Sequence, residues 1–341
     1  MTPSLSGHGR VEPMTIMISR MVIGKVNFLC LVAFTIGVFT GCTGSDDPDN
    51  PANFPNLGQL QVKATLYSVS NGSAWNTNEQ IGLFVCSNTA DMSYDQVEHK
   101  NVLCTGQGAD NYWHLEQDIQ LTSGNNTVFA YYPYKPEAAN LKKIDIDLMK
   151  MEDVCFGVND QQTILNRTQP IAIIPMRHAL AKIRFNLILD KTEEYFGPGI
   201  IEDARVVKIA PDSTVDETRN TVLTILGTLD ATTGRINTVT SGKMPIKKLV
   251  GKTFAESGIE EDKMPFFYST PESYMKDYAF AVVVDGKQHI LCVDKGTEWR
   301  AATINTYTLR LKGKGLIIDQ SDDNGFDVKP WEDCIENEID Y

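Results

Sequence analysis

Short segments in which apolar and polar residues alternate recur along this chain, and they constrain its fold more than any other feature. In residues 59–69, leucine, valine and alanine alternate with glutamine, lysine and threonine. A period of two places the apolar side chains on one face of a β-strand. Together with this first segment, we predict seven strands, the number that a β-sandwich needs, at 59–69, 81–86, 114–121, 126–132, 144–148, 171–176 and 180–189.

A second set of β-segments follows Gly197-Pro198-Gly199, the strongest break in the chain. We predict its strands at 200–209, 221–229, 235–239, 278–285, 289–293 and 303–311. Only residues 136–141 and 248–257 have the composition of short helices. Many strands with few helices predict an all-β fold, so we expect two tandem β-sandwich domains, at 55–190 and 191–341.

The N-terminal segment has the pattern of a secretory signal peptide. Arg20 and Lys25 precede an apolar run at 26–40, which ends in Gly41-Cys42. The run is shorter than the roughly 18–20 residues of a membrane-spanning helix. We therefore interpret residues 1–41 as a cleaved leader. Residues 1–16 are interpreted as an over-called start, because Met17 or Met21 would give a more typical leader.

Residues 38–42 resemble a bacterial lipobox, in which the cysteine is acylated and becomes the first residue of the mature protein. We therefore predict lipidation at Cys42, followed by a flexible tether at 42–54 that is polar and contains proline. Ser45-Asp46-Asp47 resembles the surface-export signal of Bacteroidetes lipoproteins, so we expect a lipid-anchored protein on the outer face of the outer membrane. The alternative is a plain signal peptide that ends beside an incidental cysteine.

The charge of the chain argues against a role in nucleic-acid binding. The formal net charge is −13, and it becomes −15 without residues 1–41, which hold three basic residues and one acidic residue. A surface with no basic stripe cannot release phosphate counterions. Beyond the leader and Cys42, five cysteines remain, and none forms a Cys-x-x-Cys pair. They are interpreted as buried small hydrophobes or as including one unassigned disulfide.

The motifs of common enzymes are missing from the sequence. It contains no nucleophile elbow, phosphate-binding loop, zinc-protease helix or dinucleotide fingerprint. No two of the histidines beyond the leader stand at metal-ligand spacing, and His178 is interpreted as a hydrogen-bonded structural residue. The acidic stretch 319–330 lacks the glycine and glutamate positions of a calcium loop. We therefore predict no metal, no cofactor and no enzymatic activity.

Several separated segments resemble the fimbrillin family of Bacteroidetes, which builds type V pili. Trp75 and the segment 79–84 (Glu-Gln-Ile-Gly-Leu-Phe) resemble an early motif of the family. The Tyr-Tyr-Pro-Tyr segment at 131–134 and the His-Ala-Leu-Ala-Lys segment at 178–182 resemble two others. Residues 303–311 and Trp331 are similar to its late strand and final tryptophan. These segments occur in the family's order over most of the chain.

The resemblance implies two transthyretin-like sandwich domains and a subunit that joins other pilus subunits by donor-strand exchange, for cell adhesion. Relatives activated by an arginine-specific protease carry an arginine after the first strand, whereas this chain has none between Cys42 and Arg167. This chain is therefore processed differently, or is an unprocessed anchor or accessory subunit. Its last residues alternate, with Ile335, Ile339 and Tyr341 against acidic neighbours, which suits a donor strand or an acidic tail.

Two further hypotheses concern the surface of the protein. Asp212-Ser213-Thr214 resembles the O-glycosylation pattern of secreted Bacteroidetes proteins, which makes Ser213 a candidate for modification. The alternative function is a surface glycan-binding lipoprotein or pilus tip adhesin that contacts host or bacterial ligands. In that case Trp75 with Trp113, or Trp299 with Trp331, would cluster on an exposed face, whereas burial of the tryptophans favours a scaffold.

Overall fold

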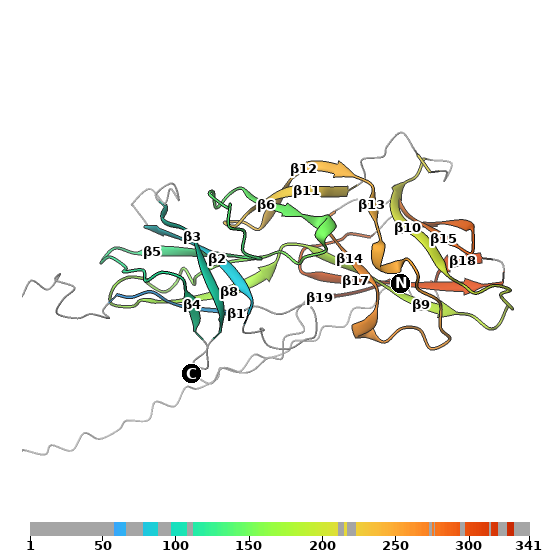
Figure 1. Cartoon of the computed structure of the whole chain (residues 1–341), viewed down its shortest axis with the longest axis horizontal. Coiled ribbons are helices and arrows are strands. Elements are labelled where there is room, and N and C mark those ends of the chain that lie inside the picture. The colour runs from blue at the N-terminus through green and yellow to red at the C-terminus, as the bar shows by residue number, and fades with distance from the viewer. Residues whose placement is uncertain are drawn as a thin grey trace, which may run out of the picture. The chain divides into compact units, whose positions relative to one another are not determined.

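Among the residues that the structure describes, nearly all regular secondary structure is β-strand (Figure 1). The structure is a computed structural model and describes residues 58–65, 78–87, 97–107, 112–210, 215–216, 223–272, 275, 277–293, 297–313, 315–319 and the strand at 326–330. Its helical elements in these ranges are single 3-10 turns: η2 (Leu148–Lys150), η3 (Lys247–Leu249) and η4 (Glu261–Lys263). The predicted all-β fold is therefore confirmed. In the described ranges, no helix is both long and apolar enough to cross a bilayer.

Seven strands from the first half of the described chain form a closed barrel, in the order β1-β4-β3-β2-β5-β7-β8. Their bounds are β1 (Gln61–Thr65), β2 (Gln80–Ser87), β3 (Val97–Gln107), β4 (Trp113–Leu115), β5 (Asn126–Tyr132), β7 (Cys155–Val158) and β8 (Ile171–His178). Neighbouring strands are antiparallel except for β1 and β8, which close the barrel as a parallel pair. Closure leaves no strand of the barrel with a fully unpaired edge.

The remaining strands form three further sheets. The first has the order β12-β11-β6, with β6 (Ile144–Asp147), β11 (Leu223–Asp230) and β12 (Arg235–Gly242). The second has the order β13-β10-β15-β16, with β10 (Ile201–Lys208), β13 (Met244–Pro245), β15 (Tyr278–Val284) and β16 (Lys287–Cys292). The third has the order β14-β9-β17-β18, with β9 (Ala181–Leu189), β14 (Phe266–Ser269), β17 (Thr303–Lys312) and β18 (Gly315–Ile318), while β19 (Phe326–Pro330) also pairs with β17.

Two strands that precede residue 190 pair with strands that follow it. β6 leaves the barrel between β5 and β7 and pairs with β11. β9 follows directly after β8, yet it lies between β14 and β17. The domain boundary at residue 190 stays a prediction, and strand pairing crosses that position at both elements.

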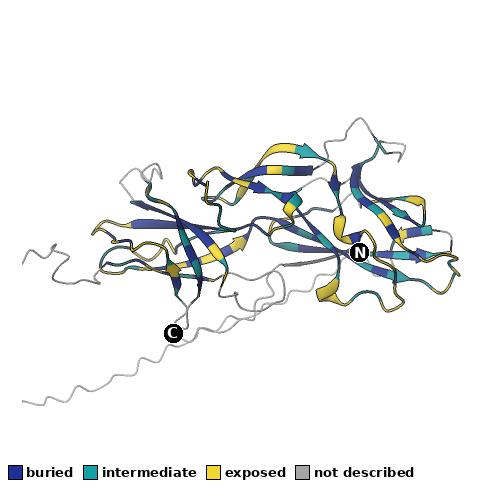
Figure 2. Ribbon diagram, viewed as in Figure 1, coloured by how far each residue is buried: buried dark blue, intermediate teal, exposed yellow. Residues whose placement is uncertain are grey.

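β2 and β5 are buried on both faces because they lie between two apolar core clusters (Figure 2). On β2, Ile81, Leu83 and Val85 fill the barrel, whereas Phe84 and Cys86 belong to the core cluster that includes the later sheets. β5 is divided in the same way, with Val128 inside the barrel and Phe129 in the outer cluster. Strands covered on both faces have unbroken apolar sequences, as residues 81–86 and 128–131 do.

The structure corrects several predicted elements. The strand expected at 114–121 ends at Leu115, although Ile119 and Leu121 beyond it are still buried. The segment 248–257 contains only the end of the turn η3, and 136–141 forms turns. The sequence did not predict β3, whose polar stretch Glu98–Asn101 hides the alternation, or the short strands β7, β13, β14, β18 and β19. Asn101 has a φ of 52°, at the irregular part of the β2–β3 ladder.

We expect Phe84→Ala to reduce the free energy of unfolding by about 3–5 kcal/mol, because it removes a buried ring and leaves a cavity. Phe84 is fully buried, and its ring lies 6.1 Å from that of Tyr131, centroid to centroid. Urea denaturation of the purified protein measures the loss. Phe196→Ala is the matched control, because Phe196 is 85% exposed and its removal should change stability by less than about 0.5 kcal/mol. An equal loss of unfolding free energy in the two variants would contradict the burial of Phe84 in the core.

Candidate functional site

β1 is the strand that completes the barrel, and residues near it fill the barrel interior. The side chains of Leu60, Val62 and Ala64 are buried there, whereas Gln61 and Thr65 are exposed. This is the alternation that the sequence predicted for residues 59–69. The buried side chains meet a core that contains Trp113, Ile174 and residues of every other barrel strand. Without β1, this apolar core would be open to water along one side.

The backbone of β1 is held mainly by one neighbour. Five residue pairs, from Gln61↔Ile171 to Thr65↔Pro175, join it to β8 in parallel register. On its other edge, β4 provides only the pair Val62↔Trp113. The Trp113 side chain adds a hydrogen bond of 3.1 Å from Nε1 to the carbonyl oxygen of Ala64. β8 is therefore the main template that positions β1.

The outer face of β8 is apolar where it pairs with β1. β8 alternates strictly between exposed and buried residues. Ile171 and Ile173 are 44% and 55% exposed, while Ala172 and Ile174 face the barrel interior. The exposed isoleucines therefore lie on the strand that receives β1.

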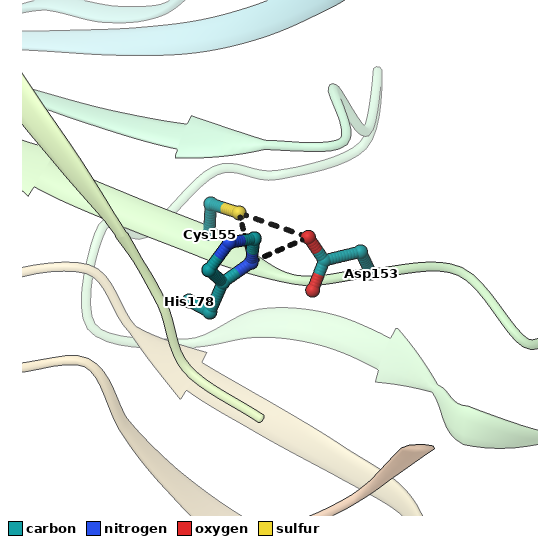
Figure 3. A group of neighbouring side chains, drawn as sticks. All are labelled: Asp153, Cys155 and His178. Atoms are coloured by element: carbon teal, nitrogen blue, oxygen red, sulfur yellow. Dashed lines mark hydrogen bonds and ion pairs between the residues drawn. The ribbon is translucent and has the colours of Figure 1, made fainter. Parts of the chain in front are cut away.

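A cluster of three polar side chains is buried where β7 and β8 meet (Figure 3). Cys155 opens β7 and pairs in register with His178, the last residue of β8. Residues paired across antiparallel strands project to the same face, which brings these two side chains together. Asp153, two residues before Cys155, completes the cluster, and all three are at most 8% exposed.

The hydrogen bonds of the cluster converge on one carboxylate oxygen. Oδ2 of Asp153 lies 2.7 Å from Nδ1 of His178 and 3.2 Å from Sγ of Cys155. The sulfur and Nδ1 are 3.4 Å apart. The other oxygen, Oδ1, accepts the backbone N–H of Val154 at 2.8 Å, which orients the carboxylate. The prediction that His178 is hydrogen-bonded is confirmed.

This geometry does not suit nucleophilic catalysis. In a catalytic triad the acid and the nucleophile contact different nitrogens of the imidazole, whereas here Asp153 and Cys155 both approach Nδ1. Burial, and then the charge of Asp153, raise the pKa of the Cys155 thiol well above its usual value, so it is not a thiolate at neutral pH. The same residue types do match metal ligands, because one ligand atom from each lies within 4.8 Å of the others. The spacing of histidines in the sequence could not indicate this set, because only one of its three residues is a histidine.

Two tyrosines extend the polar cluster beyond the barrel. Tyr132 ends β5, and Tyr268 lies on β14 in a different sheet. Burial, followed by electrostatic contributions that include Asp153 and Cys155, raises the pKa of both phenols above its usual value. Both hydroxyls therefore stay protonated near the cluster. The junction between the barrel and the β14 sheet is thus a buried polar region within an otherwise apolar core.

The residues predicted for lipidation, O-glycosylation and strand donation lie outside the described residues. These are Cys42, Ser213, Ile335, Ile339 and Tyr341. The four described cysteines are Cys86, Cys104, Cys155 and Cys292, and all of them are free thiols. The first three are buried, as predicted for small hydrophobes, although Cys155 also belongs to the polar cluster, and Cys292 is exposed. No disulfide, which was the predicted alternative, joins any two of these four cysteines.

The two described tryptophans are buried. Trp113 packs inside the barrel. Trp299 is 0% exposed, lies against the rings of Phe267 and Phe280, and donates a hydrogen bond to the hydroxyl of Tyr307 at 3.0 Å. Neither ring is available to stack on a sugar. Trp75 and Trp331 lie outside the described residues.

Comparison with known proteins gives a consistent result. The model of the fimbrillin-like family matches residues 65–331. A candidate cell adhesion protein from Bacteroides uniformis shares 16% identity over 80% of this chain and 98% of its own, with a TM-score of 0.57. Another from Bacteroides ovatus shares 12% identity over 80% and 97% of the two chains, with a TM-score of 0.53. Among curated proteins, no sequence matches.

At these identities, the solved structures show a shared fold, and the family match rests on the sequence itself. It includes the motifs at β2, at the end of β5, across β8 and β9, and along β17. These segments supply much of the buried core. Because the match spans most of the chain and the fold agrees with it, this protein belongs to the fimbrillin-like family.

Proposed function

We propose that this protein is a structural or accessory subunit of a type V pilus that joins its neighbours by donor-strand exchange at the position of β1. Membership of the fimbrillin-like family supports a subunit of a cell-surface fimbria that assembles with other subunits. The observation that best supports the proposed mode of assembly is the way β1 is held in the barrel. It fills the barrel core, yet it is held chiefly by one parallel neighbour.

The physical chemistry of β1 suits replacement by a strand from another chain. A donated strand would restore the ladder to β8 and cover the apolar core again, which contributes roughly 25 cal/mol per Å² of apolar area removed from water. An alternating strand would place the apolar side chains of one face toward the barrel core, as β1 does with Leu60, Val62 and Ala64. Any strand with this pattern could occupy the site in the same register.

The C-terminal residues are the proposed donor. Ile335, Ile339 and Tyr341 alternate with acidic residues, as an inserted strand requires. Release of β1 in this chain needs a protease that does not depend on arginine, because no arginine lies between Cys42 and Arg167. Lys63 lies within β1, and the next lysine after it is Lys100. An unprocessed anchor or accessory subunit would keep β1 in place.

Removal of β1 should allow the chain to polymerise. We would insert a recognition sequence for a specific protease between Asn71 and Gly72, cleave the purified chain and incubate it. We expect SDS-resistant ladders, because the exposed barrel core accepts a strand from a neighbour. Denaturing electrophoresis without boiling measures them, and the uncleaved chain is the baseline.

A matched variant tests the donor. In the same cleavable chain, Ile335, Ile339 and Tyr341 are replaced by aspartate, which should prevent ladders because charged side chains cannot enter the core. Ladders that persist in this variant would place the donor elsewhere in the chain. A monomer that persists after clean loss of β1 in the unsubstituted chain would argue strongly against strand exchange.

The same proposal includes a lipid anchor on Cys42, in the outer membrane and facing outward. It rests on the lipobox-like residues 38–42 and the polar tether that follows. We expect Cys42→Ser to abolish labelling by radioactive palmitate and to release the protein from the membrane fraction. Cys30→Ser is the matched control, because Cys30 lies within the leader and should leave labelling unchanged. Absence of label in the unsubstituted protein would favour a plain signal peptide, and label that survives in Cys42→Ser would place the lipid on another residue.

Ser213 is proposed as an O-glycosylation site on the basis of Asp212-Ser213-Thr214. Protein purified from a Bacteroidetes host should carry glycan mass that Ser213→Ala removes, as measured by intact mass spectrometry. Ser45→Ala, in the tether, is the control and should retain that mass. An unmodified mass in the unsubstituted protein would reject this site.

We propose no enzymatic role for the chain. The buried cluster has a protonated thiol and a shared imidazole nitrogen, which do not support nucleophilic chemistry. The burial of Trp113 and Trp299 favours a scaffold over a glycan-binding platform. Adhesion would then be a property of the assembled fimbria.

A further inference from the structure

The buried cluster of Asp153, Cys155 and His178 is more than the barrel needs for packing. Burying a carboxylate is costly unless strong partners satisfy it. The recorded partners of the Asp153 carboxylate are the Val154 N–H, the imidazole and a thiol, and a thiol is a weak donor. A serine hydroxyl would serve better if hydrogen bonding were the only role of position 155. A cysteine there calls for chemistry that uses sulfur.

We propose that Asp153, Cys155 and His178 form a binding site for a thiophilic divalent cation such as Zn²⁺. Thiolate, imidazole and carboxylate are the three ligand classes that zinc uses in proteins. Calcium and magnesium prefer all-oxygen sites, so this mixed set disfavours them.

The distances within the cluster are close to those of a metal site. Zinc binds sulfur at about 2.3 Å and nitrogen or oxygen at about 2.0–2.1 Å, so tetrahedral ligand atoms lie about 3.3–3.6 Å apart. The separations here are 3.4 Å from sulfur to nitrogen, 3.2 Å from sulfur to oxygen and 2.7 Å from oxygen to nitrogen. The carboxylate oxygen must therefore move away from Nδ1 by roughly 0.6 Å to admit the ion. A rotation of the Asp153 side chain supplies such a movement.

The charge balance also favours a divalent ion. Binding replaces the thiol proton of Cys155, which passes to solvent, and the imidazole carries its proton on Nε2 so that Nδ1 can bind the ion. The ion's two positive charges then meet one thiolate and one carboxylate, and the site is neutral. A neutral set is the least costly to keep in a buried region. Three protein ligands leave a fourth coordination position, which water fills in many zinc sites.

The bound ion would hold together one end of the β7–β8 pair. It would join the start of β7 to the end of β8, beside Tyr132 of β5 and within the electrostatic reach of Tyr268 on β14. Metal binding to the folded state alone raises stability by mass action. The consequence is a barrel braced at the end of the strand that receives β1.

Cobalt substitution tests the site directly. The full chain, purified in detergent and treated with a chelator, is titrated with Co²⁺ while the near-ultraviolet absorption is recorded. We expect a thiolate-to-cobalt charge-transfer band that saturates at one ion per chain and disappears when Zn²⁺ is added. We also expect Zn²⁺ to raise the Tm in a concentration-dependent way.

Three variants assign the band to its ligands. Cys155→Ser keeps a hydroxyl donor for Asp153, and therefore the hydrogen-bonded cluster, but it should lose the band. His178→Gln should weaken Co²⁺ binding by more than about 100-fold, because losing even an outer partner of a ligand costs 10–100-fold. Cys104→Ser is the control and should keep the band, since Cys104 is equally buried but belongs to no such cluster within the described ranges.

The unsubstituted chain can overturn the proposal without any variant. If it shows neither a charge-transfer band nor a Tm shift, the three residues form a hydrogen-bonded cluster only. A band that survives in Cys155→Ser, or that is lost in Cys104→Ser, would assign the ion to another thiol and reject this site.

Discussion

The parallel pairing of β1 with β8 is the contact on which the closed barrel depends. Antiparallel neighbours can be joined by a short turn, but a parallel neighbour must return from a distance. Here residues 66–170 separate the two strands, so no local connection enforces their register. What holds β1 is its ladder to β8 and the burial of alternate side chains in the barrel core. Both interactions would act equally on a strand of another chain, which is the physical basis of the proposed strand exchange.

The shared core limits how much of the molecule can change when a strand is exchanged. β2 and β5 bury one face in the barrel and the other against the cluster that includes β9, β15 and β17. That cluster contains the stacked and edge-on rings of Phe185, Phe267, Phe280, Trp299 and Tyr307. β1 contributes only to the barrel interior. The side of the barrel that faces the larger core is therefore built from strands other than the one proposed to exchange.

The sequence predicted those strands whose residues follow a regular alternating or apolar pattern. β5 and β9 alternate or run apolar throughout, and their bounds agree with the expected ones to within a residue. β3 was not predicted, because its outward positions include Glu98 and Lys100 and because a bulge interrupts its ladder. The segment 116–121 was wrongly predicted to continue a strand, because its apolar residues alternate. The side chains of Ile119 and Leu121 are buried in the barrel core, but their backbones form only an isolated bridge to residues 58–60 and no regular ladder. Alternation alone cannot distinguish these cases.

The buried cluster illustrates a second limit, and it connects the two proposals. Asp153 and Cys155 are close in sequence, but His178 reaches them only through the β7–β8 register, which residue spacing does not encode. That register ends where β8 stops pairing with β7 and the chain turns into β9. β1 pairs with residues 171–175 of the same strand, so His178 lies just beyond the segment that receives it. A cation bound there would fix the end of β8 while leaving its pairing positions free, so strand exchange and metal binding can occur in one subunit without competing.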